Sequence, residues 1–457
     1  MARNGRGAAQ PAAAPAAAPP APLPTPAAST PPPPPSPAWD WQQLGRPPSP
    51  EELPLLSAPP LPPPPAPPPF PSLSTPLRLA LGAASAYLSV YCLRKPWSAA
   101  TYASDRHKLR LSLAQTCGYA AGKLAAVPLV GGVRRAAAPR ALLLAALLSS
   151  LAWAAFAAGG GAVAIGAASL PLGAAWPLAY RMVEGRRASD AVGAALGAVV
   201  VLGAGVAKAL GGALLQRGLS AEQMPLAAAA AALPCCAAAA ALLSGTPPPS
   251  SAERVEMGER TPLGAAAVRQ LCGRHWAGLA MLGVHYAIVS ALKDVRDAFQ
   301  PELWMQLQHA PSSSVAFVAT ELPATVVVVA FLTMLARVRS NSAAMFIVFG
   351  ALVLSVASLP ALSTLRARGV ISGSTWFSAL GVATYMAYLP VSTALFDRMA
   401  GAMHFGGTAT FFMQVMDAVG YAGSVTVLVA MHWFHVTPDQ MLYYCDRLVG
   451  GAATINL

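Results

Sequence analysis

Charge is scarce in this chain of 457 residues. Asp, Glu, Lys and Arg make up 11% of it, whereas hydrophobic residues make up 55%. Ordinary soluble domains carry about 25% charged residues. A soluble protein of this composition would have to hide more apolar surface than its few charges could cover. The composition therefore excludes a typical soluble enzyme and favours a polytopic membrane protein.

Motifs that carry catalysis or hold a cofactor are also lacking. The six cysteines form no Cys-x-x-Cys pair and have no histidine at metal-ligand spacing. The chain contains neither the phosphate-binding Gly-x-x-x-x-Gly-Lys loop nor the His-Glu-x-x-His and Gly-x-Ser-x-Gly patterns of hydrolases. We therefore expect neither an enzyme nor a bound cofactor or metal ion.

The net charge of +12 does not indicate a nucleic-acid partner, because the basic residues occur singly or in short groups between apolar runs. Membrane proteins keep Lys and Arg in their cytoplasmic loops. Loops such as the one with Arg134, Arg135 and Arg140 make one side of the predicted membrane domain richer in these residues. This bias predicts a cytoplasmic N-terminus and a lipid bilayer as the surrounding partner, and it does not indicate which membrane.

Residues 1–76 form a Pro/Ala-rich tail that holds 28 of the 45 prolines. Such a segment buries no core and is expected to be disordered or to adopt polyproline II. Proline-rich stretches of this kind also bind SH3 or WW domains, so a partner at the tail is one hypothesis. The first 39 residues contain Arg3 and Arg6 but no acid, which resembles an organelle targeting peptide.

Apolar runs long enough to cross a bilayer follow the tail. We expect eleven of them, at 77–94, 112–131, 141–158, 162–182, 190–214, 223–244, 276–293, 313–336, 343–362, 370–392 and 407–431. The first six make an N-terminal half, residues 77–244, and a polar cytoplasmic loop, 245–275, separates it from a C-terminal half, 276–457. After Phe434 the chain turns polar, so a twelfth span is missing or divergent.

The two halves repeat each other in sequence. An acid follows seven residues after a proline in both the fourth and the tenth spans, as Pro177 with Glu184 and Pro390 with Asp397. Two six-helix halves around a polar loop are typical of transporters, whose binding site lies between the halves near the midplane. Glu184 and Asp397 are candidate gating or coupling residues.

Charged residues inside the predicted spans are the main functional signal. A charge at the centre of a membrane helix costs roughly 2.5–3.5 kcal/mol on insertion scales, so it is retained where it faces a partner or a water-filled cavity. Four cations and two acids are of this kind: Arg94, Lys123, Lys208, Lys293, Glu321 and Asp417. If all of them line one cavity, its potential is positive and its natural ligand is an anion.

Pairing within the spans is the main alternative. Lys208 with Glu321 and Lys123 with Asp417 would then form switchable locks between the halves, and the two acids leave proton coupling open. Arg94 with Lys293 would otherwise extend to the headgroups as interfacial anchors. The segment 294–297, with two aspartates and an arginine, is expected to be an exposed loop network.

Three stretches resemble the organophosphate:phosphate antiporters, a branch of the major facilitator superfamily. They are the segments 91–97 (Tyr-Cys-Leu-Arg-Lys-Pro-Trp), 118–123 (Gly-Tyr-Ala-Ala-Gly-Lys) and 173–181, which runs from Gly to Arg through Trp-Pro. In that branch an arginine of the first helix and one of the seventh hold the substrate phosphate, with a lysine of the second helix nearby. The resemblance implies these roles for Arg94 and Lys123.

The same resemblance extends to neighbouring residues of the implied site. Lys293 is the seventh-helix match and departs from the arginine of the branch, and an ammonium binds phosphate as a point charge rather than bidentately. Tyr91, Tyr119 and Arg181 complete the substrate-binding residues that the resemblance implies.

Over residues 77–432 the chain is more similar to an uncharacterised group of integral membrane proteins distantly related to that superfamily. The stretches that carry this similarity lie at 170–187, 296–304, 320–323 and 385–421. It implies an all-α, polytopic, major facilitator-like fold of two six-helix halves. Two departures are the missing acid in the loop at 131–135 and the missing twelfth span.

We therefore expect a secondary transporter that moves a small organic anion, such as a phosphate ester, by alternating access. Arg94, Lys123 and Lys293 would bind the anion, and Lys208, Glu321 and Asp417 would gate or couple the cycle. One alternative is a receptor-like or scaffold protein that does not transport, which the two departures favour. Another is a proton-coupled cation carrier that uses Glu321 and Asp417.

Overall fold

A computed structural model shows the described part of this chain as a set of packed helices. The residues described are 74–102, 105–183, 189–248, 250, 265–307, 313–403, 409–437 and 440–456, and none of them forms a β-strand. The predictions made for the tail up to residue 73 lie outside this set, as does Glu184.

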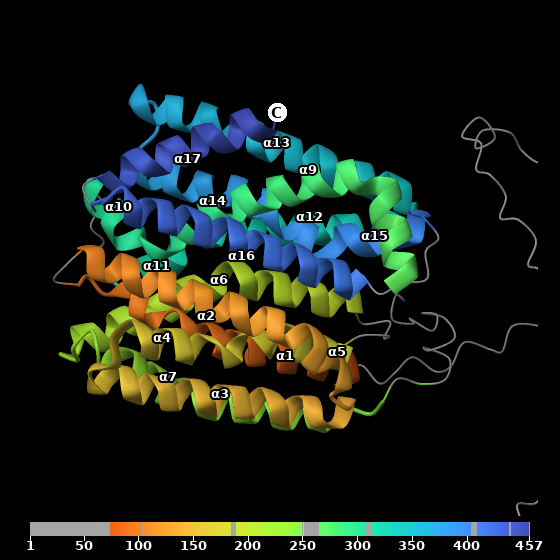
Figure 1. Cartoon of the computed structure of the whole chain (residues 1–457), viewed down its shortest axis with the longest axis horizontal. Helices are drawn as coiled ribbons and strands as arrows, with labels where there is room; N and C mark the ends of the chain where they lie inside the picture. The colour runs from red at the N-terminus through yellow and green to blue at the C-terminus, as the bar shows by residue number, and fades with distance from the viewer. Residues whose placement is uncertain are drawn as a thin grey trace, which may run out of the picture. The chain divides into compact units, whose positions relative to one another are not determined.

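The N-terminal half is built from seven helices, of which α4 and α5 follow each other in one crossing (Figure 1). Their bounds are α1 (Ser74–Arg94), α2 (Asp105–Gly132), α3 (Ala138–Ala155), α4 (Gly161–Ser169), α5 (Ala175–Val183), α6 (Ser189–Gln216) and α7 (Met224–Ser244). The predicted spans lie within these helices to within a few residues.

The C-terminal half repeats this arrangement with two short helices added. Its helices are α9 (Ala265–Ala298), α10 (Gln300–Gln306), α11 (Ala316–Ala319), α12 (Leu322–Ala336), α13 (Asn341–Ala367), α14 (Gly373–Pro390), α15 (Phe396–Met403), α16 (Ala409–Trp433) and α17 (Met441–Asn456). The α14 and α15 helices are joined through a wide π turn at 391–395, so they also make one crossing.

One expectation about the C-terminal half requires correction. The segment 294–297 is helical and buried rather than an exposed loop, because α9, which has a kink at His275, continues to Ala298. After Phe434 the chain forms the further helix α17, which packs against α9 and α13. The α17 helix is not among the helices of the described residues that are long and apolar enough to cross a membrane, in agreement with a missing or divergent twelfth span.

Nine helical segments of the described residues are long and apolar enough to cross a membrane. One of them, 135–182, contains both α3 and the α4–α5 crossing. The chain reverses between these at Gly159 and Gly161, whose φ angles of 97° and 53° are rarely adopted by residues with a side chain. The α2 helix is not among the nine, although its 28 residues are enough to span.

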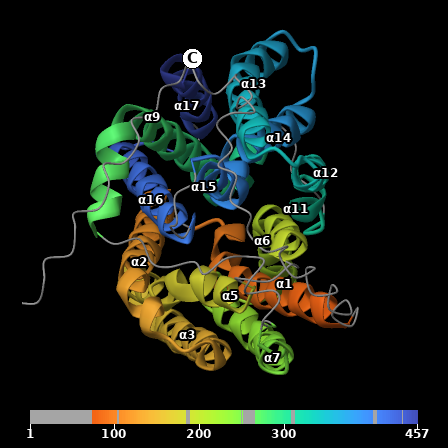
Figure 2. The same ribbon diagram turned by 90° about the vertical axis from the view of Figure 1, so that its right-hand side faces the viewer.

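The two halves meet along two pairs of helices. In Figure 2, α2 lies beside α16, and α6 lies beside α11 and α12, and the residue contacts agree with this view. Each pair joins the second crossing of one half to the fifth crossing of the other half. Charged side chains on α1, α2, α6 and α9 are thereby brought to the boundary between the halves.

Candidate functional site

A small cavity lies at the boundary between the halves and collects several of the predicted residues. Its volume is about 20 Å³, which holds a water molecule rather than an organic substrate. Both halves contribute its lining, which consists of Tyr87, Tyr91, Lys123, Trp176, Val200, Lys293, Tyr388, Ser392, Asp417 and Tyr421. The structure is therefore a closed state in which aromatic and charged side chains fill the centre.

Arg94 ends α1 and lies against tyrosines of this lining. Its side chain is buried, with the guanidinium carbon 3.8 Å from the centre of the Tyr119 ring and 5.8 Å from that of Tyr91. Nη1 donates a long hydrogen bond of 3.5 Å to the Tyr421 hydroxyl, and Nε has no partner. Arg94 forms no ion pair with a carboxylate of the described residues. It is a buried cation with unused donors.

Close helix packing positions Lys123. At Gly122 of α2, a β-carbon would lie 1.9 Å from the Leu170 carbonyl oxygen, and one at Gly173 would lie 2.4 Å from the Gly122 backbone. Only glycine permits this approach between α2 and the α4–α5 crossing. The lysine that follows Gly122 is therefore held at the edge of the cavity.

Lys123 reaches across the boundary and forms an ion pair with Asp417 of α16. The other carboxylate oxygen of Asp417 accepts a 2.8 Å hydrogen bond from the Tyr286 hydroxyl of α9. The pairing considered from the sequence is thus present. Tyr286 was not identified there, since a tyrosine in an apolar run gives no signal of its own.

Lys293 lines the same cavity but is bound by its own neighbour. Its ammonium lies 2.6 Å from Asp294 Oδ1 and 5.1 Å from the centre of the Tyr388 ring. Neither Arg94 nor Lys293 extends to a headgroup position, because both side chains are buried. Two of the three predicted substrate-binding cations, Lys123 and Lys293, thus line one cavity. Arg94 does not line it but contacts Tyr91 and Tyr421, which do.

Lys208 and Glu321 do not pair with each other, and this expectation was wrong. Glu321 Oε1 and Oε2 lie 3.0 and 3.2 Å from Arg296 Nη1, whereas Lys208 bonds the Gln300 side-chain oxygen and, at 3.3 Å, the Asp297 carbonyl oxygen. Arg296 was not among the predicted site residues, because the predicted seventh span ended at residue 293. The extra turn of α9 carries Arg296 to α12.

We call this set the buried network: Lys208, Arg296, Asp297, Gln300, Glu321 and Tyr385. Tyr385 donates to the Asp297 carboxylate at 3.4 and 3.5 Å, and Arg296 is 3.4 Å from the same carboxylate. Its two cations balance its two acids, and all its members are buried. None of its members lines the central cavity.

Lys108 makes a second ionic contact between the halves. Its ammonium lies 2.6 Å from Glu302 Oε1 of α10 and donates at 3.1 Å to the Ser98 carbonyl oxygen. Lys108 precedes the predicted span at 112–131 by four residues. The start of α2 at Asp105 places it inside the helical bundle.

Lys95 lies just past the end of α1 and is buried. Its ammonium makes no hydrogen bond or ion pair with the described residues. Burial, together with the neighbouring Arg94 guanidinium, lowers the pKa of Lys95 to about 7. An ammonium in such surroundings loses its proton near neutral pH.

The remaining candidates lie away from the cavity. Arg181 is half-buried in the last turn of α5, and Asp397 is half-buried in the first turn of α15, and both have partners. Neither lines the central cavity. Glu184, the expected counterpart of Asp397, lies outside the described residues.

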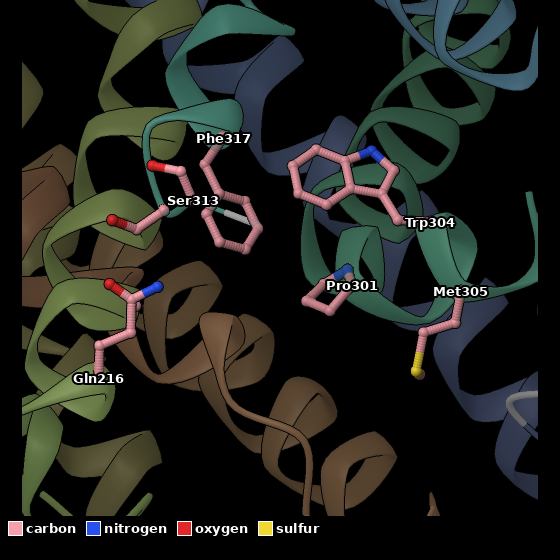
Figure 3. A pocket seen from close by; sticks show the side chains of 8 residues that line it. Gln216, Pro301, Trp304, Met305, Ser313 and Phe317 are labelled. Carbon is pink, nitrogen blue, oxygen red and sulfur yellow. The ribbon is translucent and has the colours of Figure 1, made fainter. Parts of the chain in front are cut away.

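A larger cavity of about 210 Å³ opens between α6, α10 and α11. Figure 3 shows Gln216 of α6 on one side and Pro301 and Met305 on the other, with Trp304 and Phe317 above. The rings of Trp304 and Phe317 stack at 4.7 Å. The described residues that line this cavity include no charged side chain.

The family of unknown function DUF5690 matches residues 96–453. The chain belongs to this family. The match covers most of both halves, from the turn after α1 to the last turn of α17. No curated protein matches the chain.

Solved structures show the fold of this DUF5690 member. A D-xylose-proton symporter matches with a TM-score of 0.52 and 14% identity over 84% of this chain and 96% of its own. A mutant of the nucleoside transporter NupG matches with a TM-score of 0.55 and 11% identity over 83% of this chain and 98% of its own. The chain thus has the predicted all-α, major facilitator-like fold of an integral, multi-pass membrane protein. At sequence identities this low, the similarity shows the fold and does not indicate the substrate.

Proposed function

We propose that this DUF5690 protein is a secondary transporter that moves a small organic anion by alternating access between its two halves. The single observation that carries the proposal is Arg94. A buried guanidinium without a carboxylate partner, next to a cavity between two halves, is costly unless a ligand uses it. The symporter and nucleoside-transporter folds of the solved relatives support the class of mechanism.

The balance of charge favours an anion. Five cations lie at or near the boundary between the halves: Arg94, Lys123, Lys208, Lys293 and Arg296. Four carboxylates oppose them: Asp294, Asp297, Glu321 and Asp417. This excess of one positive charge, to which Lys95 adds a second when it is protonated, gives the cavity region a positive potential, which attracts small anions.

Alternating access requires contacts between the halves that can break. The Lys108–Glu302 and Lys208–Gln300 contacts both cross the boundary at the end of the bundle where α1 and α9 end. The cavity is too small for a substrate in this state. In the proposed cycle, these contacts part to admit the anion from one side and form again before the other side opens.

The finer parts of the proposal concern the ligand and the orientation. A phosphate ester is one candidate anion because of the segment 91–97, in which Arg94 lies. We propose a cytoplasmic N-terminus from the charge bias of the loops. Proteolysis or antibody access to the tail in sealed vesicles tests the orientation.

The decisive experiment is exchange in proteoliposomes that contain the full chain. Labelled inorganic phosphate, glycerol 3-phosphate, succinate and gluconate would be offered against the same unlabelled anion inside. We expect exchange of at least one of them, lowered about 10- to 100-fold in Arg94→Gln, because a hydrogen-bonded charge contributes about 1.5–3 kcal/mol. Arg94→Lys should retain part of the activity.

Two results would reject the proposal. One is wild-type protein, folded and reconstituted, that exchanges none of the four anions. The other is an Arg94→Gln, Lys123→Gln double variant that exchanges as fast as wild type. The first result would favour the receptor-like or scaffold alternative.

A further inference from the structure

Asp417 holds a position that conflicts with simple anion binding. It lines the central cavity and pairs with Lys123, and both side chains are 11% exposed. Lys293, the other cation of the cavity, is held by Asp294. In this state the cavity therefore offers an incoming anion no unpaired ammonium, and the Asp417 carboxylate repels it.

We propose that Asp417 is the proton-binding group that couples transport to a proton gradient, so that the protein is a proton–anion symporter. A proton on Asp417 would release Lys123 to the substrate anion. This inference rests on the proposed function, because it assigns the coupling ion to the same site.

The chemistry of the step is a simple proton transfer. A proton from water adds to the Asp417 oxygen that faces Lys123, and the carboxyl group becomes neutral. The other oxygen still accepts the hydrogen bond from Tyr286. Lys123 then carries an uncompensated positive charge. Lys123 Nζ and Arg94 Cζ lie 5.6 and 3.8 Å from the centre of the Tyr119 ring, so an anion bound in the cavity relieves the repulsion between the two cations.

Proton and anion therefore help each other to bind. The proton creates the cationic site, and the anion stabilises the protonated state by the same free energy. Release reverses both events on the other side of the membrane. The anion leaves, Asp417 gives its proton to water, and the Lys123–Asp417 pair forms again.

The groups around Asp417 leave it as the proton acceptor of this cavity. The charged or titratable side chains that face it or share its cavity are Tyr87, Tyr91 and Arg94 of α1, Tyr119 and Lys123 of α2, Tyr286 and Lys293 of α9, Tyr388 of α14 and Tyr421 of α16. All of these are tyrosines or basic side chains. Asp417 is the only carboxylate among the described residues that line the cavity.

Glu321 was the other candidate acid for coupling, and its surroundings argue against that role. It is fully buried, both its oxygens bond Arg296, and it lines neither cavity. Protonation there would break a buried ion pair without opening a site for a ligand. Asp417 therefore lies at the cavity, where a proton and a substrate can bind, whereas Glu321 lies away from it.

The test uses the full chain in proteoliposomes with the dye pyranine inside at pH 7.5 and an outer buffer at pH 6.0. Valinomycin with equal potassium on both sides holds the membrane potential at zero. The probes are labelled succinate and glycerol 3-phosphate. We expect the wild type to accumulate the anion it exchanges, up to about tenfold per pH unit for one proton per anion, and to acidify the lumen as it does so.

Asp417→Asn should abolish both accumulation and acidification, while exchange of the anion at equal pH persists. The matched control is Asp446→Asn on α17. Asp446 also forms an ion pair, with Arg366, but lies outside the cavity, so this variant should accumulate the anion as wild type does. If Asp417→Asn fails to fold, the Lys123→Gln, Asp417→Asn double variant removes both charges and should show no proton flux.

The outcomes separate this inference from the proposed function. Wild-type exchange with neither accumulation nor acidification under the gradient overturns proton coupling but leaves the transporter in place. Accumulation by Asp417→Asn equal to that of wild type overturns the assignment to Asp417. Absence of any exchange by the wild type rejects the proposed function itself.

Discussion

The central cavity and the buried network contain similar charged residues in different surroundings. Around the cavity, Arg94 has no acidic partner among the residues that the structure describes, and the Lys123–Asp417 pair lines the cavity. In the network, Arg296 and Glu321 are fully buried, and positive and negative charges are equal in number. A balanced, sealed network holds helices together, whereas an unbalanced one beside a cavity is arranged for a ligand.

The largest effect that would test this comparison is expected at Glu321. Glu321→Gln leaves the fully buried Arg296 with the more distant Asp297 carboxylate, at 3.4 Å, as its one charged partner among the described residues. Breaking a buried pair on one side costs about 3–5 kcal/mol. We expect a marked fall in the melting temperature in detergent, measured by tryptophan fluorescence. The matched control is Asp446→Asn. An unchanged melting temperature would show that the network does not hold the fold.

An effect of intermediate size on stability and exchange is expected where α2 packs closely against the α4–α5 crossing. Gly122→Ala places a β-carbon against the Leu170 carbonyl oxygen, so the helices must separate and Lys123 must move. Overpacking of this kind costs about 1–3 kcal/mol, and anion exchange should fall with it. Gly193→Ala on α6 is the control, because no atom lies within 4 Å of its added carbon. Equal behaviour of the two variants would contradict the role of the α2 packing.

The smallest effect is expected at Lys95, which the cavity and the network both leave unpaired. Its pKa is about 7 in the fold and about 10.4 in the unfolded chain. The unfolded state therefore binds the proton more tightly, and stability rises as the pH increases from 7 to 10. Lys95→Met should raise the melting temperature most at pH 6.5, and the gain should shrink at pH 9.5. A gain that does not depend on pH would show that this ammonium does not titrate.

Much of the fold could be predicted from the sequence, because apolar length and the scarcity of charge are local properties. The spans, the two halves and the break between them all follow from such runs. The α17 helix could not be found in this way, since tertiary contacts with α9 and α13 stabilise a helix of mixed polarity.

Less of the site could be predicted. Arg94, Lys123, Lys293 and Asp417 stood out because charges are rare in membrane spans. Their partners did not, since pairing depends on which helix faces which across the boundary. Lys123 and Asp417 lie almost three hundred residues apart and meet only because α2 packs on α16.

The sequence alone determined that this chain is a helical membrane protein with two repeated halves and a surplus of buried cations. Those properties depend on composition and order along the chain. Only the tertiary structure decided that Arg296 rather than Lys208 binds Glu321, and that Asp417 rather than Glu321 shares a cavity with Lys123. The physical reason is that burial and Coulomb energy depend on distances through space, which the packing of helices sets.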